Sequence, residues 1–100
     1  MDLADPVFEP GGTGIRMQWR PRLNLLLEEL QKAPAILRLS YLADVEEEAL
    51  VERRMQAVQK QIAEAWEAMN CCYQLTIEPE VFWRLGGPPG KPDVPRQEAR

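Results

Sequence analysis

The sequence of 100 residues contains no histidine and a single serine, Ser40. Nucleophilic catalysis of the common kinds places a serine or cysteine beside a general base, and histidine is the usual base. Ser40 falls in a predicted strand and lacks the flanking glycines of a nucleophile elbow. We therefore expect a protein that is not an enzyme and has no catalytic residue.

Cysteine is also scarce, since Cys71 and Cys72 are the only two and are adjacent. Normal disulfide geometry needs a wider separation of the Cα atoms than neighbouring residues usually offer. A zinc site needs four ligands, and there is neither a histidine nor a second cysteine pair to complete it. "GGTGIR", residues 11–16, lacks the lysine of a phosphate-binding loop. We expect incidental or structural thiols, no metal and no cofactor, with a redox or metal role as the alternative.

Long apolar runs and basic clusters are absent as well. No run approaches the roughly 18 to 20 apolar residues that cross a bilayer, so no membrane-spanning segment is expected. The beginning, "MDLADPVFEPGG", lacks the basic start and apolar core of a secretory signal, which leaves a cytoplasmic protein or a piece of a longer exported precursor. The 12 basic residues are scattered among 16 acidic ones, and the net charge is -4. Nucleic acid is therefore not an expected partner.

The composition is that of one small folded domain, with 45% hydrophobic and 28% charged residues. A short first strand is predicted at residues 6–8, within a segment rich in Gly and Pro at residues 1–18. Pro21 suits the first turn of a helix, and leucines recur at helical spacing until Pro34. "AILRLSYL", residues 35–42, is typical of a strand.

A second helix and a third strand follow. Asp44 is predicted to cap the helix, whose C-terminal cap lies near Asn70. Its apolar stripe consists of Val51, Met55, Val58, Ile62, Trp66 and Met69. "CCYQLTIE" alternates like a strand, which residues 81–83 extend beyond a bulge or bend at Pro79. Residues 84–100 are rich in Pro and Gly and predict a disordered tail.

The order strand, helix, strand, helix, strand favours an α/β fold, an α+β sandwich with two helices packed on one face of a small sheet. "YLAD", ending at Asp44, and "ALVERRMQAV" resemble the signature of the OmpA-like domain, the peptidoglycan-associating module of bacterial envelope proteins. That signature has a strand ending in Thr-Asp and a helix with Leu, Arg and Val at the spacing of Leu50, Arg54 and Val58. The resemblance covers residues 6–83 and agrees with the βαβαβ order.

The resemblance implies a ligand site formed by Asp44 and Arg54. In the OmpA-like family the aspartate and the arginine hold the amino acid end of the diaminopimelate side chain in the peptidoglycan stem. A carboxylate takes the ammonium group, and a guanidinium takes the carboxylate in paired hydrogen bonds. The implied function is a non-enzymatic cell-envelope domain that binds peptidoglycan weakly. It would belong to a larger exported protein of the periplasm or outer membrane.

The sequence departs from the family signature at several positions. Ala43 stands in place of the Thr, Glu47 falls where an Asn is expected, and the loop between Asp44 and Leu50 is shorter. Glu47 adds a negative charge near a ligand carboxylate. The alternative function is therefore a structural or protein-interaction module that kept the fold, lost the ligand and meets another protein domain through the Trp83 edge or its sheet.

Overall fold

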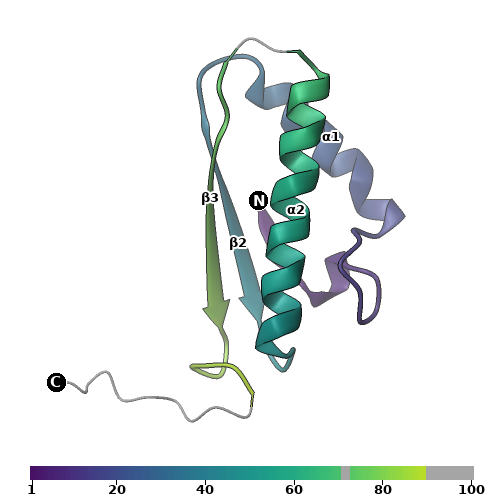
Figure 1. The fold of residues 1–100 in the computed structure, drawn as a ribbon, viewed down its shortest axis with the longest axis vertical. Coiled ribbons are helices and arrows are strands. Elements are labelled where there is room, and N and C mark those ends of the chain that lie inside the picture. The colour runs from purple at the N-terminus through teal and green to yellow at the C-terminus, as the bar shows by residue number, and fades with distance from the viewer. Residues whose placement is uncertain (71–72, 90–100) are drawn as a thin grey trace, which may run out of the picture.

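A three-stranded parallel sheet with two helices on one face makes up this computed structural model, which describes residues 1–70 and 73–89 (Figure 1). The elements are β1 (Asp2–Ala4), α1 (Arg20–Leu30), β2 (Ile36–Ala43), α2 (Glu48–Ala68) and β3 (Thr76–Trp83), with 3₁₀ turns at Asp5–Val7 and Met17–Trp19. The predicted α/β fold with the βαβαβ order is confirmed.

Strand β2 is central and pairs with β1 on one side and β3 on the other. Alternate side chains of β2 point to opposite faces. Leu37, Leu39, Tyr41 and Ala43 are buried beneath the helices, whereas Ile36 and Leu42 are exposed on the other side. We call this second side the open face. By strand register it consists of Asp2, Ala4, Ile36, Arg38, Ser40, Leu42, Thr76, Glu78, Glu80 and Phe82.

The core lies between the sheet and the helices. Helix α1 contributes Leu23 and Leu27. Helix α2 contributes Val51, Met55, Val58, Ile62 and Trp66, which confirms the predicted apolar stripe at these positions. Met69 packs against the core while remaining partly exposed. The same buried side of α2 also carries a charged residue, Arg54.

The first strand was placed wrongly, since β1 is Asp2–Ala4 and not residues 6–8. Pro6 has a fixed φ and no N–H group, and it occupies the start of the 3₁₀ turn at Asp5–Val7. Phe8 instead forms an isolated bridge with Ile15. The strand forms earlier in the chain, where all three residues of β1 pair with β2 and Leu3 buries its side chain.

The predicted start of the second helix was also wrong. The helix begins at Glu48 with Glu47 as its N-cap, and no side chain caps it. Asp44 lies in the preceding loop, where its backbone N–H donates to Glu46 Oε1 at 2.9 Å. The C-terminal prediction was better, because Asn70 has a φ of 52° in the left-handed region that ends many helices.

Strand β3 passes through Pro79 in unbroken register with β2, so no bulge interrupts it there. The Arg84 N–H donates to the Ala43 carbonyl at 2.8 Å, which shows that even-numbered residues direct their N–H groups toward β2. Odd-numbered residues therefore direct theirs to the free edge. Pro79, which has no N–H group, falls on that outward side, where proline is tolerated in a sheet.

The predicted disordered tail and the two cysteines fall partly or wholly outside the residues that the structure describes. Residues 84–89 form turns after β3, whereas residues 90–100 of the predicted tail, together with Cys71 and Cys72, lie outside the described residues. Neither described helix has the length and hydrophobicity needed to cross a membrane. The prediction of no membrane-spanning segment agrees with this finding.

Candidate functional site

Arg54 is the charged residue at the centre of the molecule, with a side chain that is 0% exposed. Its Nη1 donates to Asp5 Oδ1 at 2.8 Å and to the Tyr41 hydroxyl at 2.8 Å. Its Nε donates to the Gly12 carbonyl at 2.7 Å, and its Nη2 contacts the Glu9 carbonyl at 3.4 Å. Four of the five N–H groups of a guanidinium thus have partners within the chain.

An aromatic ring covers one face of this guanidinium. Arg54 Cζ lies 4.8 Å from the centroid of the Phe8 ring, a cation–π contact. Phe8 in turn stacks on Tyr41, with 5.8 Å between the ring centroids. Arg54 therefore fastens the loop of residues 5–15 to both α2 and β2.

Tyr41 extends the network toward the carboxyl ends of the strands. Its hydroxyl donates to Glu46 Oε2 at 2.8 Å. Burial raises the pKa of Tyr41 to about 12, since the Arg54 hydrogen bond that favours the phenolate offsets only part of the burial effect. We call Arg54, Asp5, Tyr41 and Glu46, with the carbonyls of Glu9 and Gly12, the Arg54 network.

Two charged groups of the Arg54 network, the Glu46 carboxylate and the Arg54 guanidinium, are held in their ionised forms. Burial by itself would raise the pKa of Glu46, but hydrogen bonds from the Asp44 backbone and the Tyr41 hydroxyl outweigh burial and lower it. Burial likewise opposes the charge on Arg54, while Asp5 and Tyr41 raise its pKa. Each charge is compensated within the chain, which is the usual condition for a buried arginine.

The two predicted ligand residues have different partners. Asp44 is 47% exposed and its Oδ2 lies 3.7 Å from Nη1 of Arg84. Arg54 is bonded to Asp5 and has no exposed surface to offer a ligand. Asp44 and Arg84 line a pocket of about 350 Å³ at the carboxyl ends of the strands, together with Asp5 and Glu46. Ligand binding by Asp44 and Arg54 remains a prediction, and the arginine that accompanies Asp44 is Arg84.

A second hollow lies on the open face. Ala4, Pro6, Trp19, Leu42 and Phe82 supply its apolar wall, and its volume is about 630 Å³. Leu42 and Phe82 are partners in the strand register, and each is 52% exposed. We call this hollow the open-face groove.

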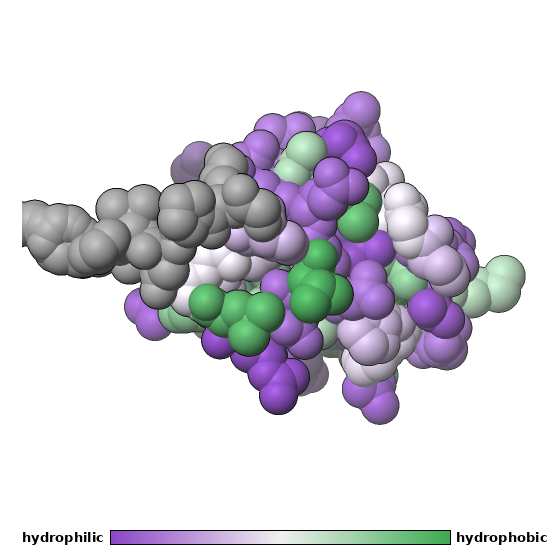
Figure 2. Space-filling view, turned by 90° about the horizontal axis from the view of Figure 1, so that it is seen from below, coloured by the Kyte–Doolittle hydropathy of each residue, from purple (hydrophilic) through white to green (hydrophobic). Residues whose placement is uncertain are grey.

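The carboxyl end of the sheet carries further exposed apolar residues. Figure 2 views the molecule from this end and shows hydrophobic side chains at the surface among hydrophilic ones. Val45 and Leu85, in the loops that follow β2 and β3, are both largely exposed. Apolar surface is therefore concentrated around the ends of β2 and β3.

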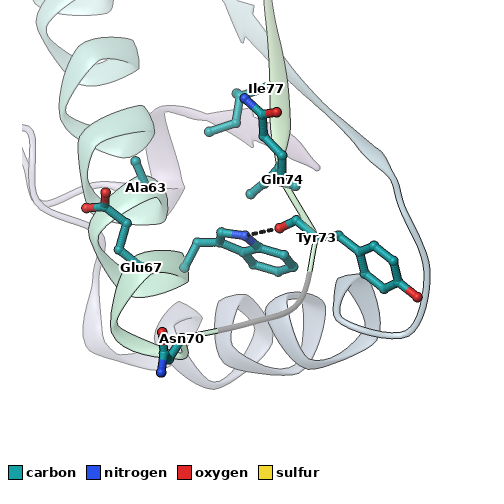
Figure 3. Close-up of a pocket in the computed structure, with 8 residues that line it drawn as sticks. Ala63, Glu67, Asn70, Tyr73, Gln74 and Ile77 are labelled. Carbon is teal, nitrogen blue, oxygen red and sulfur yellow. Dashed lines mark hydrogen bonds between the residues drawn. The ribbon is translucent and has the colours of Figure 1, made fainter.

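A third hollow, of about 740 Å³, lies where α2 leads into β3 (Figure 3). Glu67 lines it from the helix, Asn70 from the turn that follows the helix, and Tyr73 and Gln74 from the segment before β3. The Trp66 indole N–H donates to the Tyr73 carbonyl at 2.9 Å across it. This contact ties the end of the helix to the next strand, and the predicted place of Trp66 in the core is confirmed.

No set of side chains in residues 1–70 and 73–89 has the grouping of three or more ligands that a metal ion needs. Ser40 lies in β2 as predicted and lines the open-face groove. These described residues contain no histidine, and the groove places no charged pair at its apolar wall. Its surface is suited to contact with apolar groups.

The sequence contained a signal for the burial of Arg54 that the stripe prediction passed over. Arg54 is three residues after Val51 and four before Val58, so it shares their side of the helix. Its partners were harder to foresee, because Asp5 is 49 residues away in the chain. The spacing of residues within one helix or strand does not reveal a pair as distant as Arg54 and Asp5.

Comparisons with protein-family models, with curated proteins and with solved structures give no match to this chain. The resemblance to the OmpA-like domain therefore rests on the quoted residues and on the βαβαβ order. What this molecule does has to be inferred from its own surface, where the open-face groove and the Asp44–Arg84 pocket are the two candidate sites.

Proposed function

We propose that this chain is a non-enzymatic protein-interaction module that binds another protein through the open face of its sheet. The observation that carries the proposal is the bare apolar surface at Leu42 and Phe82, which are half exposed on adjacent strands. Parallel sheets are generally covered on both faces, whereas here the helices cover only one. A partner on the open face would complete the usual arrangement.

The energetic gain from such contact is moderate. Full burial of a Leu or Phe side chain stabilises by about 1.5 to 3 kcal/mol, so covering the exposed half of Leu42 and Phe82 contributes about 1 kcal/mol each. Trp19 and Pro6 add further apolar area along the groove. These values suit a specific contact whose apolar centre is bordered by polar side chains.

Site-specific photo-cross-linking tests this function. A photoreactive amino acid is placed at Leu42 in the chain produced in its source cells, and at Leu25 in a control. Leu25 lies on α1 and is 62% exposed, so it matches Leu42 in exposure but not in location. Reproducible cross-linking to a protein at Leu42 and not at Leu25 is expected. Equal yields at both positions, or no product at Leu42, would contradict the proposal.

A second candidate is the cell-envelope function, with weak binding of the peptidoglycan stem peptide. The observation that favours it is the exposed carboxylate of Asp44 beside the exposed guanidinium of Arg84 in one pocket. Such a pair offers complementary charges to the ammonium and carboxylate of a free amino acid end. In that case the chain is part of a larger exported protein of the periplasm or outer membrane.

Co-sedimentation with diaminopimelate-type peptidoglycan separates the two candidates. The envelope function predicts binding that is lost in both Asp44→Ala and Arg84→Ala, with Arg53→Ala as a control, because Arg53 is an exposed arginine on α2. Failure of the folded wild-type domain to sediment would remove this candidate. The result is independent of cross-linking at Leu42.

A further inference from the structure

The charges on the open face indicate what kind of surface it accepts. Its strand positions carry three carboxylates, from Asp2, Glu78 and Glu80, and one guanidinium, from Arg38. Arg38 Nε already lies 3.5 Å from Glu78 Oε1. The strand positions of the face therefore carry a net charge of −2 around the apolar centre, while Arg22 lies over the Trp19 ring at the border of the groove. A partner whose basic groups lie over the strands, beside its apolar surface, would complement this charge.

The edges of the sheet are poorly suited to binding an added strand. Strand β1 has only three residues, Asp2–Ala4. On β3, Pro79 occupies a position whose N–H would face outward, so the free edge lacks a donor midway along the strand. An occupant of the open face is thus expected to lie on the sheet and not to extend it.

The dimensions of the open face match those of one helix. Neighbouring strands lie about 4.8 Å apart, so beside Ser40–Leu42, where β1 is present, the outer strands are about 10 Å from each other, which is close to the diameter of a helix with its side chains. Along the rest of β2 the face is two strands wide. The eight residues of β2 span about 26 Å, the length of a helix of about 17 residues. A helix in the groove would contact Leu42 and Phe82 through one apolar stripe.

Building on the proposed function, we propose that the open face binds an amphipathic helix of a partner protein, with lysine or arginine residues on both sides of its apolar stripe. The stripe packs on Leu42, Phe82 and the wall formed by Pro6 and Trp19. The basic side chains lie over the carboxylates of the face. A second copy of this chain is a poorer occupant, because two copies of the same acidic face repel each other.

Fluorescence anisotropy with two designed peptides tests this inference. Both peptides have about 18 residues and the same leucine stripe, flanked by lysines in one and by glutamates in the other. The lysine peptide is expected to bind the full chain at least about tenfold more tightly at low salt, with the difference shrinking as salt is added. Equal affinity for the two peptides, or binding of neither, would overturn the inference.

Matched variants locate the contact. Leu42→Thr combined with Phe82→Thr is expected to weaken binding of the lysine peptide by about tenfold, since two apolar contacts are lost. Leu25→Thr, a change of a similarly exposed leucine on α1, should leave the affinity unchanged. Glu80→Lys should weaken the lysine peptide and strengthen the glutamate peptide. A double variant that binds like the wild type would place the peptide elsewhere and overturn the inference.

The remaining outcomes separate this inference from the proposed function. Cross-linking at Leu42 together with equal affinity for the two peptides would retain the docking function and reject the basic helix. Absence of both the cross-link and peptide binding would reject both. Sedimentation velocity tests whether a second copy of this chain occupies the open face. Self-association of the wild type that is abolished in Phe82→Thr would identify a second copy and overturn the helix inference.

Discussion

The two faces of the sheet differ in how completely the rest of the chain covers and bonds their side chains. Beneath the helices, Tyr41 is fully buried and even the guanidinium of Arg54 has partners within the chain. On the open face, Leu42 and Phe82 remain half exposed, although Leu42 stands between the buried Tyr41 and Ala43 in the sequence. Alternation along a strand thus places a completed interior and an uncovered surface one residue apart. The covered face therefore maintains the fold, while the open face remains available for contact with a partner.

The largest effect is expected from removing Arg54. Arg54→Ala leaves the Tyr41 hydroxyl and two backbone carbonyls without a donor and opens a cavity, which should lower the free energy of unfolding by about 3 to 5 kcal/mol. Arg53→Ala, at the exposed neighbouring position, should change it by less than about 0.5 kcal/mol. Urea denaturation measures both. Similar values for the two variants would show that the network does not maintain the covered face.

A smaller effect is expected for Tyr41→Phe, which removes only a hydroxyl group. The loss of one acceptor for Arg54 and one donor to Glu46 should cost about 1 to 3 kcal/mol. Tyr73→Phe, at an exposed tyrosine, is the control. Denaturation curves at neutral pH should separate the two variants, and coincident curves would contradict the prediction.

The raised pKa of Tyr41 predicts that the protein loses stability in alkali. This pKa is raised from 10.0 to about 12, so the folded state favours the protonated form. The resulting stabilisation is complete below about pH 10 and is lost as the pH rises toward 12. Tyr41→Phe should lack this component, which unfolding curves between pH 9 and 12 can measure. An identical pH dependence in variant and wild type would argue against it.

The lowered pKa of Glu46 predicts a smaller loss of stability in acid. This pKa is lowered from 4.5, so the contribution of Glu46 is present above that value and is lost as the pH falls through the lowered pKa. Glu46→Gln should therefore reduce the fall in stability on acidification, while Glu47→Gln, an exposed neighbour, should not. Thermal unfolding between pH 6 and pH 3 gives the comparison. A steeper decline in Glu46→Gln would contradict the assignment.

The smallest effect on stability is expected on the open face. Phe82→Thr keeps a strand-compatible residue at a half-exposed position and should lower the free energy of unfolding by about 1 kcal/mol or less. Leu39→Thr, at a buried position on the same sheet, should cost several times more. A large loss in Phe82→Thr would mean that the open face already supports the fold, and the contrast between the two faces would weaken.

The sequence predicted what depends on local patterns. The spacing of Val51, Val58 and Ile62 identified α2, and the alternation around Leu39 identified β2, because burial on one side imposes these periods. Strand β1 was misplaced because three residues are too few to show alternation, and Phe8 appeared the more strand-like position. The pairing of β1 is established only when β2 lies beside it.

The candidate site was harder to predict for a related reason. Asp44 was correctly located near the end of a strand, but its partner Arg84 follows the next strand and is 40 residues further along the chain. Arg54 was identified by its spacing, but that spacing did not reveal its partner Asp5, which is 49 residues away in the chain. Pairing between distant segments depends on the tertiary fold, which one sequence does not display.

The bond between Arg54 and Asp5 also has a consequence for the order in which the chain can fold during synthesis. Asp5 and the carbonyls of Glu9 and Gly12 leave the ribosome well before Arg54, which is more than forty residues behind them. Until α2 is made, this early segment has no guanidinium to bind, and long-range contacts of this kind form slowly. Residues 5–12 therefore cannot make these contacts, and so cannot reach their final position, until α2 has been synthesised.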